Sequence, residues 1–272
     1  MALPVVTCLC PTYGRFESLR DAVACFLLQD YPEKRLLILD DSISAVPFPR
    51  SNQTLRETNL PESARHWKTT RFETLGHKRQ ALIEAAESPL VAHWDDDDLY
   101  LPWHLSMLVE ALQASGKACV KPGAGWFGKG PRTGWKNSQH PHHNVFEGQM
   151  LFDRKAALDL GGYPPLDSGQ AKALLVKFAR AGQLHKWNPP DAEVSYVYRW
   201  ADGADHVSAR GKRGSRDADW GGGEPIIPDN IVRQWWAEGR VLSQFDAIPG
   251  WRDGPRSGAS GSVCGQTPLP AV

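Results

Sequence analysis

The first third of the chain alternates between short apolar runs and segments with helical periodicity, and this alternation most constrains the fold. The short apolar runs, which resemble buried strands, are residues 5–10, 36–39 and 90–94. Between them, residues 16–27 and 76–87 carry apolar side chains at helical spacing, and residues 67–72 are a further candidate strand. Alternating strands and helices predict an α/β layer structure around a largely parallel sheet.

The second half is less regular, and each element is predicted from its own local signal. The expected helices are 102–113, 154–160, 171–181 and 231–242, and the expected strands are 118–121, 146–152 and 194–200. Residues 123–135, rich in glycine and tryptophan, predict a hairpin or loop. With no internal repeat, we expect one domain, residues 1–245, and a flexible tail, residues 246–272.

The charge balance and the apolar runs exclude several classes of protein. The chain has 31 Lys plus Arg and 31 Asp plus Glu, so it offers no overall basic field for a nucleic acid polymer or an anionic membrane. No apolar run approaches the ~20 residues that span a bilayer, and the first residues do not read as a secretory signal. A cytoplasmic protein without a transmembrane segment is therefore expected. Its five cysteines, an odd count, are read as small buried hydrophobes.

Four consecutive aspartates, Asp95, Asp96, Asp97 and Asp98, directly follow the third predicted strand. Adjacent carboxylates repel one another and raise each other's pKa. Apolar residues flank this acidic run on both sides, which favours a cation bound at a strand end. The alternative is a solvated acidic turn.

The other two predicted strands also end in residues that suit a ligand site. Residues 11–13 (PTY) end the first strand, and residues 40–42 (DDS) end the second. In a parallel sheet with right-handed crossovers, the carboxyl ends of the strands lie along one edge, where ligands bind. These two segments and the acidic run therefore form one candidate site.

Five motifs in this order resemble the family 2 glycosyltransferases of the GT-A fold. They are VTCLCPTYGR, LLILDDS, GHKRQALIEAAESPLVAHWDDDDLYLP, MLFDRKAALDLGGYP and YVYRWADGADHVS, and together they extend over roughly residues 4–208. The resemblance implies a Rossmann-like three-layer sandwich with a central, mostly parallel sheet. Residues 1–115 would form its nucleotide-binding half and residues 116–245 its acceptor-binding half.

The resemblance also implies a reaction. The family transfers a sugar, usually with inversion, from a nucleotide-diphosphate sugar to an acceptor hydroxyl; a UDP- or dTDP-sugar and a carbohydrate or glycoconjugate acceptor are expected here. A divalent cation neutralises the charge that grows on the diphosphate leaving group. Mn²⁺ or Mg²⁺ is the expected cofactor, because both prefer oxygen ligands. The sequence does not indicate an oligomeric state.

By this resemblance, the acidic run holds the metal. Asp97 matches the last acid of the family's DxD-like motif and is the expected metal ligand. Asp95 and Asp96 would orient the ribose, or the metal through water. Asp98 would also contribute to the binding of the metal or nucleotide, or would act as a capping or solvated turn residue. His206 resembles a late histidine that reaches the metal or the diphosphate, or else is structural.

The nucleotide would be bound by residues from all three strand ends and from the helix at 76–87. The expected set is Pro11, Thr12, Tyr13, Arg15, Asp41, Lys78, Arg79, Asp95 and Asp96. Asp41 resembles the acid that receives the uracil or ribose, with Asp40 as its neighbour; for residues 11–13 the alternative is a plain turn. Lys78 and Arg79 oppose the helix dipole, so an anion or the aspartates would explain them better than solvent would.

The general base is the weak point of the resemblance. An inverting transferase needs a group that takes the acceptor's proton, and the family's acid falls where this chain has Gln170 and Ala171. Asp167 is the nearest substitute, although it would also suit a cap for the next helix. Glu147 is the second candidate and would otherwise hold acceptor hydroxyls.

Two alternatives to an active transferase stay open. A binder of sugar nucleotides or glycans that lost its base is consistent with Ala171, whereas a nucleotidyltransferase would more typically carry a glycine-rich basic loop after the first strand. The HPHH run, His140, His142 and His143, lacks zinc spacing and is read as surface histidines of an acceptor-side loop. Three tryptophans would line an acceptor groove or pack in the core: Trp126, Trp135 and Trp187.

Overall fold

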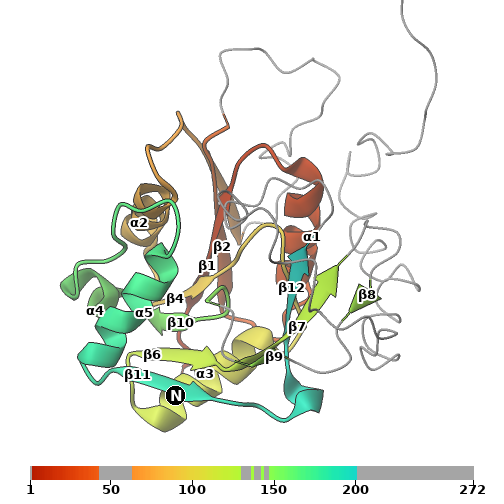
Figure 1. Cartoon of the computed structure of the whole chain (residues 1–272), viewed down its shortest axis with the longest axis vertical. Helices are drawn as coiled ribbons and strands as arrows, with labels where there is room; N and C mark the ends of the chain where they lie inside the picture. The colour runs from red at the N-terminus through yellow and green to blue at the C-terminus, as the bar shows by residue number, and fades with distance from the viewer. Residues whose placement is uncertain (1, 43–62, 130–135, 138–141, 144–146, 201–272) are drawn as a thin grey trace, which may run out of the picture.

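The computed structural model describes residues 2–42, 63–129, 136–137, 142–143 and 147–200 (Figure 1). Its central sheet has seven strands in the order β11-β6-β10-β4-β1-β2-β3. In chain order these are β1 (Val6–Thr12), β2 (Lys34–Asp40), β3 (Ala64–Lys68), β4 (Leu90–His93), β6 (Cys119–Pro122), β10 (Leu151–Asp153) and β11 (Leu184–Trp187). All neighbours are parallel except β10, which is antiparallel to β4 and β6. The predicted, mostly parallel sheet is therefore confirmed.

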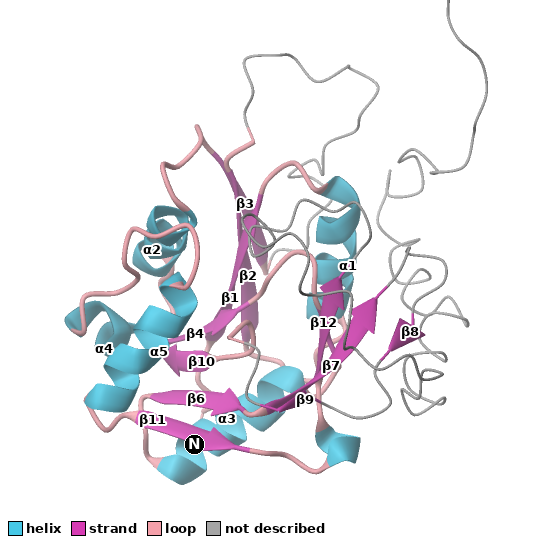
Figure 2. Ribbon diagram, in the orientation of Figure 1, coloured by secondary structure: helices cyan, strands magenta, loops and turns pink. Residues whose placement is uncertain are grey.

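Helices cover both faces of this sheet, as Figure 2 shows. The described helices are α1 (Phe16–Leu27), α2 (Leu75–Ala85), α3 (His104–Ser115), α4 (Arg154–Asp159), α5 (Gln170–Arg180) and the 3₁₀ turn η2 (Asp191–Glu193). One core packs α1 and α3 against the sheet, and the other packs α2, α4 and α5 against its opposite face. This is the expected three-layer sandwich.

Alternation along β1 divides its side chains between the two cores. Cys8 and Cys10 face the α1/α3 side, whereas Leu9 faces the α2/α5 side. Both cysteines are buried free thiols, as are Cys25 and Cys119. The reading of these four cysteines as small hydrophobes is confirmed, and burial raises the pKa of Cys10 well above its ordinary value.

A second, smaller sheet packs against the α1/α3 core. It has the order β5-β12-β7-β8, with β5 (Leu99–Tyr100), β12 (Tyr196–Trp200), β7 (Ala124–Lys129) and β8 (Lys136–Asn137), while β9 (His142–His143) also pairs with β7. Of the two alternatives predicted for 123–135, the hairpin is favoured, because β7 and β8 pair in antiparallel fashion across this stretch. The candidate strand at 67–72 lies earlier, at β3. Residues 201–272 lie outside the described part, and so do the helix expected at 231–242 and the tail. Among the described helices, none has the length and apolar character of a membrane span.

Candidate active site

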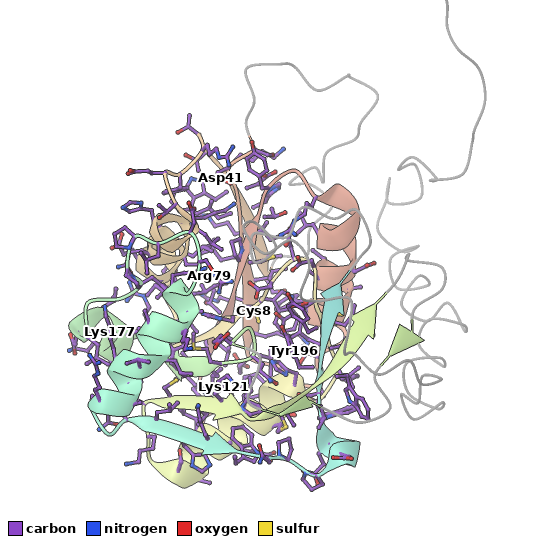
Figure 3. The ribbon with its side chains drawn as sticks, in the orientation of Figure 1. Cys8, Asp41, Arg79, Lys121, Lys177 and Tyr196 are labelled. Carbon is purple, nitrogen blue, oxygen red and sulfur yellow. The ribbon has the colours of Figure 1, made fainter. Side chains whose placement is uncertain are left out.

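The predicted strand ends lie together. β4, β1 and β2 are parallel neighbours, with Leu9 opposite His93 and Thr12 opposite Asp40. Their carboxyl ends therefore share one edge of the sheet, and Figure 3 labels Asp41 and Arg79 there. The convergence follows directly from the parallel order, because each strand delivers its last residues to the same side.

Asp96 points into the protein towards the end of β1. Its side chain is 1% exposed. It accepts hydrogen bonds from Thr12 Oγ1 at 2.6 Å, Arg15 Nε at 3.1 Å and Arg15 Nη2 at 2.5 Å. Arg15 Nη1 also donates to Asp97 Oδ2 at 2.7 Å, so one guanidinium joins two neighbouring aspartates. Burial raises the pKa of Asp96 to about 7, although Arg15 opposes the rise.

Asp95 is held by a different cation, from the opposite layer. Arg79 on α2 is buried, and its Nη2 donates to Asp95 Oδ1 at 2.5 Å. Arg79 Nη1 lies 3.1 Å from His93 Nδ1, and His93 Nε2 in turn bonds Tyr163 Oη. Burial and Arg79 lower the pKa of His93 well below its ordinary value, so His93 is neutral. Burial raises the pKa of Asp95, and Arg79 opposes this.

Asp41 is fixed by the first turn of α2. Lys78 is buried and donates both to Asp41 Oδ1 and to the carbonyl of Thr12, which ties the ends of β1 and β2 together. Burial lowers the pKa of Lys78, and Asp41 opposes that fall. The other oxygen, Asp41 Oδ2, accepts from the Phe72 backbone N–H at 3.0 Å. Lys78 is therefore not a solvated side chain, and the nearby aspartate accounts for its place.

Asp40 shapes the loop after β2. Its Oδ1 accepts from the backbone N–H of Ser42 at 3.0 Å and of Gly14 at 3.3 Å. Gly14 has φ of 61°, in the left-handed region that favours glycine. These bonds hold the PTYG turn against the end of β2, so Asp40 supports the site through the backbone.

Tyr13 presents an aromatic face at the same edge. It is 49% exposed, and the Arg71 guanidinium carbon lies 4.7 Å from the centroid of its ring. Arg71 Nη1 also donates to Tyr13 Oη at 3.3 Å. Pro11 and Thr12, by contrast, are buried within β1. Arg71 was missed by the sequence reasoning, since an isolated arginine in a polar segment gives no signal.

Asp98 is neither a solvated turn residue nor a cap. It is 2% exposed and accepts a hydrogen bond from Tyr196 Oη at 2.5 Å. Tyr100 Oη accepts from the Asp95 N–H at 2.6 Å and donates to the carbonyl of Gly148 at 3.3 Å. A Cβ on Gly148 would lie 2.7 Å from Tyr196 Oη and 2.8 Å from Asp95 Oδ2, so a larger residue there would have to displace these side chains. Sequence reasoning missed both tyrosines, which come from paired strands β5 and β12.

The acidic run suits a hard divalent cation whose coordination shell is completed by other groups. The Asp95 and Asp97 side chains are 21% and 22% exposed, so solvent reaches part of each, whereas the Asp96 side chain is 1% exposed. Within the described segments, no group of three or more His, Cys, Asp or Glu could hold a metal ion. Mg²⁺ and Mn²⁺ commonly take one or two carboxylates and fill the shell with substrate phosphates and water, so the donors present fit such an ion. His206 lies outside the described residues.

The two candidate bases lie in different surroundings. Asp167 is exposed, and its Oδ1 accepts from the Leu75 N–H at 3.3 Å at the start of α2. It thus supplements Thr74, the N-cap residue of α2, whose side chain accepts from the His77 N–H; α5 begins at Gln170, and its N-cap residue, Gly169, offers no side-chain cap. Glu147 is half-buried and precedes Gly148. Burial lowers the pKa of Lys121, and the charge of Glu147 opposes this fall.

The segment where the family's acid is expected holds no proton acceptor. Gln170 and Ala171 form the first turn of α5, and both are buried, at 5% and 9% exposure. Ala171 packs in the α2/α5 core with Tyr163. Neither residue at this position could therefore serve as the base.

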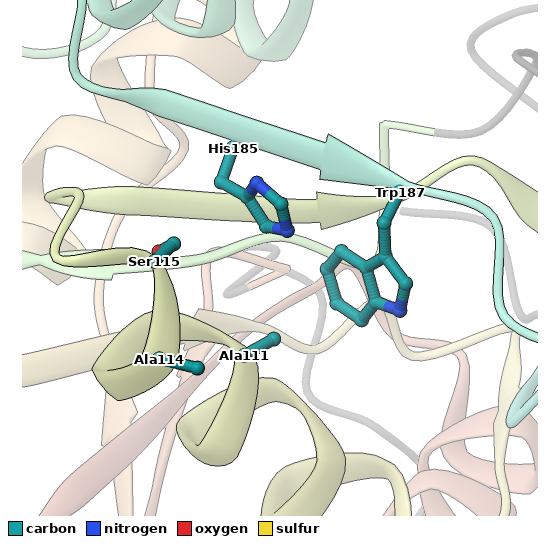
Figure 4. Close-up of a pocket in the computed structure, with 5 residues that line it drawn as sticks. All are labelled: Ala111, Ala114, Ser115, His185 and Trp187. Atoms are coloured by element: carbon teal, nitrogen blue, oxygen red, sulfur yellow. The ribbon is translucent and has the colours of Figure 1, made fainter.

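The remaining candidates divide between the core and an outer surface. Trp126 is 4% exposed and belongs to the α1/α3 core, so it packs rather than lining a groove. Trp187 on β11 stacks on His185, with ring centroids 5.6 Å apart, beside a hollow of about 320 Å³. Figure 4 shows both rings directed towards α3, and the hollow shares no residue with the acidic site. His142 and His143 form β9, while His140 and Trp135 lie outside the described residues.

Comparisons with known proteins agree with this fold. The mannosyltransferase PcManGT from Pyrobaculum calidifontis, solved with GDP-Man and Mn²⁺, is similar at a TM-score of 0.56 and 20% identity, covering 72% of this chain and 57% of that one. S. aureus TarS 1-349, solved with UDP-GlcNAc, is similar at a TM-score of 0.57 and 16% identity, covering 75% and 61%. At these identities the likeness shows a shared GT-A fold, and the chain spans about three fifths of each of those chains. No curated protein matched the chain.

The sequence profile described as glycosyl transferase family 2 matches residues 7–179. This range contains all three strand ends, the acidic run, both cations of α2 and the altered first turn of α5. It covers well over half of the chain, and its motifs are those that form the site. The chain therefore belongs to glycosyl transferase family 2, a family of glycosyltransferase enzymes with the GT-A fold.

Proposed function

We propose that the protein transfers a sugar, with inversion, from a nucleotide-diphosphate sugar to an acceptor hydroxyl of a carbohydrate or glycoconjugate, and that it uses Mn²⁺ or Mg²⁺. The observation that carries this proposal is the edge where β1, β2 and β4 end. There Asp41, Asp95 and Asp97 are each held by a separate cation of the protein. A preorganised set of carboxylates at strand ends suits a ligand that combines a nucleoside, a diphosphate and a divalent ion.

The nucleoside would lie against the ends of β1 and β2. Tyr13 and Arg71 offer an exposed aromatic and guanidinium surface for a flat base. Asp41 would offer its carboxylate to the base or ribose; its side chain is 6% exposed and is held by Lys78 and by the Phe72 N–H, so the nucleoside would have to reach a buried acid. UDP and dTDP are the nucleotides we propose. GDP belongs in the test as well, because PcManGT was solved with GDP-Man.

The diphosphate would lie at the acidic run. A divalent ion bound there would neutralise the charge that grows on the leaving diphosphate. Asp97, and Asp95 beside it, would hold such an ion, while Arg79 keeps Asp95 oriented. Asp96 is buried against Thr12 and Arg15, so its role is to anchor the loop after β1.

The proton of the acceptor hydroxyl needs a base, and two acids are candidates. Asp167 accepts from the first turn of α2, the helix that also carries Lys78 and Arg79. Glu147 directly precedes Gly148, whose backbone abuts Asp95. Replacing the true base by its amide should slow transfer strongly and leave nucleotide affinity unchanged. An unaltered rate in Asp167→Asn would exclude Asp167, and the same test applies to Glu147→Gln.

Calorimetric titration tests the donor site directly. UDP, dTDP and GDP are each titrated with Mn²⁺ and with chelator into the wild type, Asp97→Asn and, as a control, Asp159→Asn on an exposed pair with Lys155. We expect metal-dependent binding of one nucleotide, lost in Asp97→Asn and kept in the control. Equal binding by wild type and Asp97→Asn would show that the metal is bound elsewhere.

A second candidate function is nucleotide-sugar binding without transfer. The buried Gln170 and Ala171 favour it, because neither can accept a proton. Metal-dependent nucleotide affinity without release of nucleotide from any donor would support this binder. In that case Ala171→Asp is the variant with which to look for restored turnover.

A further inference from the structure

Arg15 holds the two carboxylates it contacts in unequal ways. Nε and Nη2 both donate to Asp96, at 3.1 and 2.5 Å, whereas Nη1 alone donates to Asp97, at 2.7 Å. Asp96 also receives the Thr12 hydroxyl. One side of the guanidinium is therefore fixed by a two-pronged bond, and its contact with Asp97 is a single bond.

The two carboxylates that Arg15 contacts also differ in their exposure to solvent. The Asp96 side chain is 1% exposed, whereas the Asp97 and Arg15 side chains are 22% and 33% exposed. A partly hydrated single bond exchanges partners more easily than a buried bidentate one, because water offsets the loss of the old contact. The Arg15–Asp97 contact is thus the exchangeable half of this cluster.

The carboxylate that Arg15 contacts here is also the proposed metal ligand. Asp97 Oδ2 accepts the Arg15 bond, and Asp97 is the acid proposed above as the metal ligand. A divalent cation and a guanidinium close to one carboxylate repel each other, so each lowers the affinity for the other. A nucleotide diphosphate reverses this, because its oxygens attract both the metal and a planar guanidinium.

We propose that Arg15 is a displaceable counterion of Asp97, which weakens metal binding in the ligand-free protein and couples it to nucleotide binding. When nucleotide and metal bind together, Arg15 exchanges its Asp97 bond for the diphosphate while Asp96 retains the rest of the guanidinium. This inference rests on the proposed function for the identity of the nucleotide. The repulsion between Arg15 and a metal also rests on the proposed metal site at Asp97, but it does not depend on which nucleotide binds.

The test measures Mn²⁺ affinity rather than turnover. Free Mn²⁺ is followed by electron paramagnetic resonance, with and without a saturating nucleoside diphosphate, in the wild type and Arg15→Gln. We expect Arg15→Gln to bind Mn²⁺ alone about tenfold more tightly, and the gain in Mn²⁺ affinity caused by nucleotide to shrink by about tenfold. Arg35→Gln is the control, since Arg35 forms an exposed pair with Glu87 at 3.7 Å, and it should match the wild type.

A second comparison guards against loss of fold, because Arg15→Gln leaves Asp96 buried without its cation. Asp96→Asn and the double variant Arg15→Gln/Asp96→Asn differ only at Arg15 and bury no unpaired charge. The double variant should again bind Mn²⁺ about tenfold more tightly than Asp96→Asn. Equal Mn²⁺ affinity within both pairs of proteins would overturn the proposal.

The two proposals fail in different ways. If the wild type binds no nucleotide with Mn²⁺, the proposed function fails, while tighter Mn²⁺ binding in Arg15→Gln still supports the counterion. If nucleotide binds equally with Mn²⁺ or chelator and Arg15→Gln abolishes that binding, Arg15 stands in for the metal and the displacement is refuted. Unchanged coupling between Mn²⁺ and nucleotide in Arg15→Gln also refutes it.

Discussion

The ion pair between Arg79 and Asp95 should be a major contributor to the stability of the site, and Arg79→Met tests this. The guanidinium is 10% exposed and lies 2.5 Å from Asp95, whose side chain is 21% exposed. Methionine keeps most of the volume and removes the charge. Removing one partner of a buried pair costs about 3–5 kcal/mol, because the other charge is left uncompensated. Since water reaches part of Asp95, we expect about 3 kcal/mol, the lower end of that range.

The measurement is urea unfolding followed by circular dichroism at pH 7.5 with chelator present. In thermal unfolding the same loss corresponds to a decrease in Tm of roughly 6–12 °C for a domain of this size. Arg35→Met is the matched control, because Arg35 and Glu87 are 56% and 78% exposed and 3.7 Å apart. An exposed pair of this kind contributes about 0–1 kcal/mol.

A double variant separates the charge from the packing. Asp95→Asn in the Arg79→Met background removes the carboxylate that has lost its partner. We therefore expect the free energy of unfolding to rise by about 1 kcal/mol or more relative to Arg79→Met alone. The reasoning is refuted if Arg79→Met costs no more than the Arg35 control. It is also refuted if the second substitution recovers nothing, because the loss would then come from packing.

Three further predictions follow from single contacts. Gly76→Ala should lower the free energy of unfolding by about 2 kcal/mol, despite the better helix propensity of alanine, because its Cβ would lie 1.9 Å from the Pro164 carbonyl oxygen; urea unfolding measures this. Tyr196→Phe removes the hydrogen bond to buried Asp98 and should cost about 1.5–3 kcal/mol, and an unchanged Tm would contradict it. The pKa of Asp96 rises from 3.8 to about 7 on folding, so the native state binds this proton more tightly than the unfolded state does. Protonation of Asp96 therefore stabilises the folded protein at low pH, and this stabilisation is lost as the pH rises towards the folded-state pKa. In chelator, the wild type should therefore lose more stability between pH 4.5 and 7.5 than Asp96→Asn, and parallel profiles would show that Asp96 does not titrate there.

Much of the donor site could be predicted from sequence, because it depends on local order. Short apolar runs ending in PTY, DDS and the acidic run identified three strands and their ends, and parallel pairing brought those ends together. The motif order also identified the family. The altered first turn of α5 was equally visible, since the presence of Ala171 in place of an acid requires no structure to recognise.

The direction of each carboxylate was decided only by tertiary structure. Asp96 turns towards Thr12 and Arg15, 84 and 81 residues earlier, and Asp98 turns towards Tyr196, 98 residues later. The sequence presents four adjacent aspartates as near equivalents. Their exposure differs because each meets a different layer of the fold, so the separation of accessible from buried acids had no local signal.

The sequence by itself thus determined the three strands whose ends form the site and the acids that those ends carry, since periodicity and strand-ending residues act over a few positions. It did not predict β5 or β11, and it placed the strands near residues 67–72 and 146–152 a few residues away from β3 and β10. Tertiary structure decided which cation holds each acid, that Asp167 accepts a hydrogen bond from the start of α2 and not from α5, and that the Arg71 guanidinium lies over the Tyr13 ring. The physical reason is the separation along the sequence between the residues that interact. Burial and ion pairing are set by residues brought together across layers, and a linear pattern does not record which distant side chains will share one low-dielectric site.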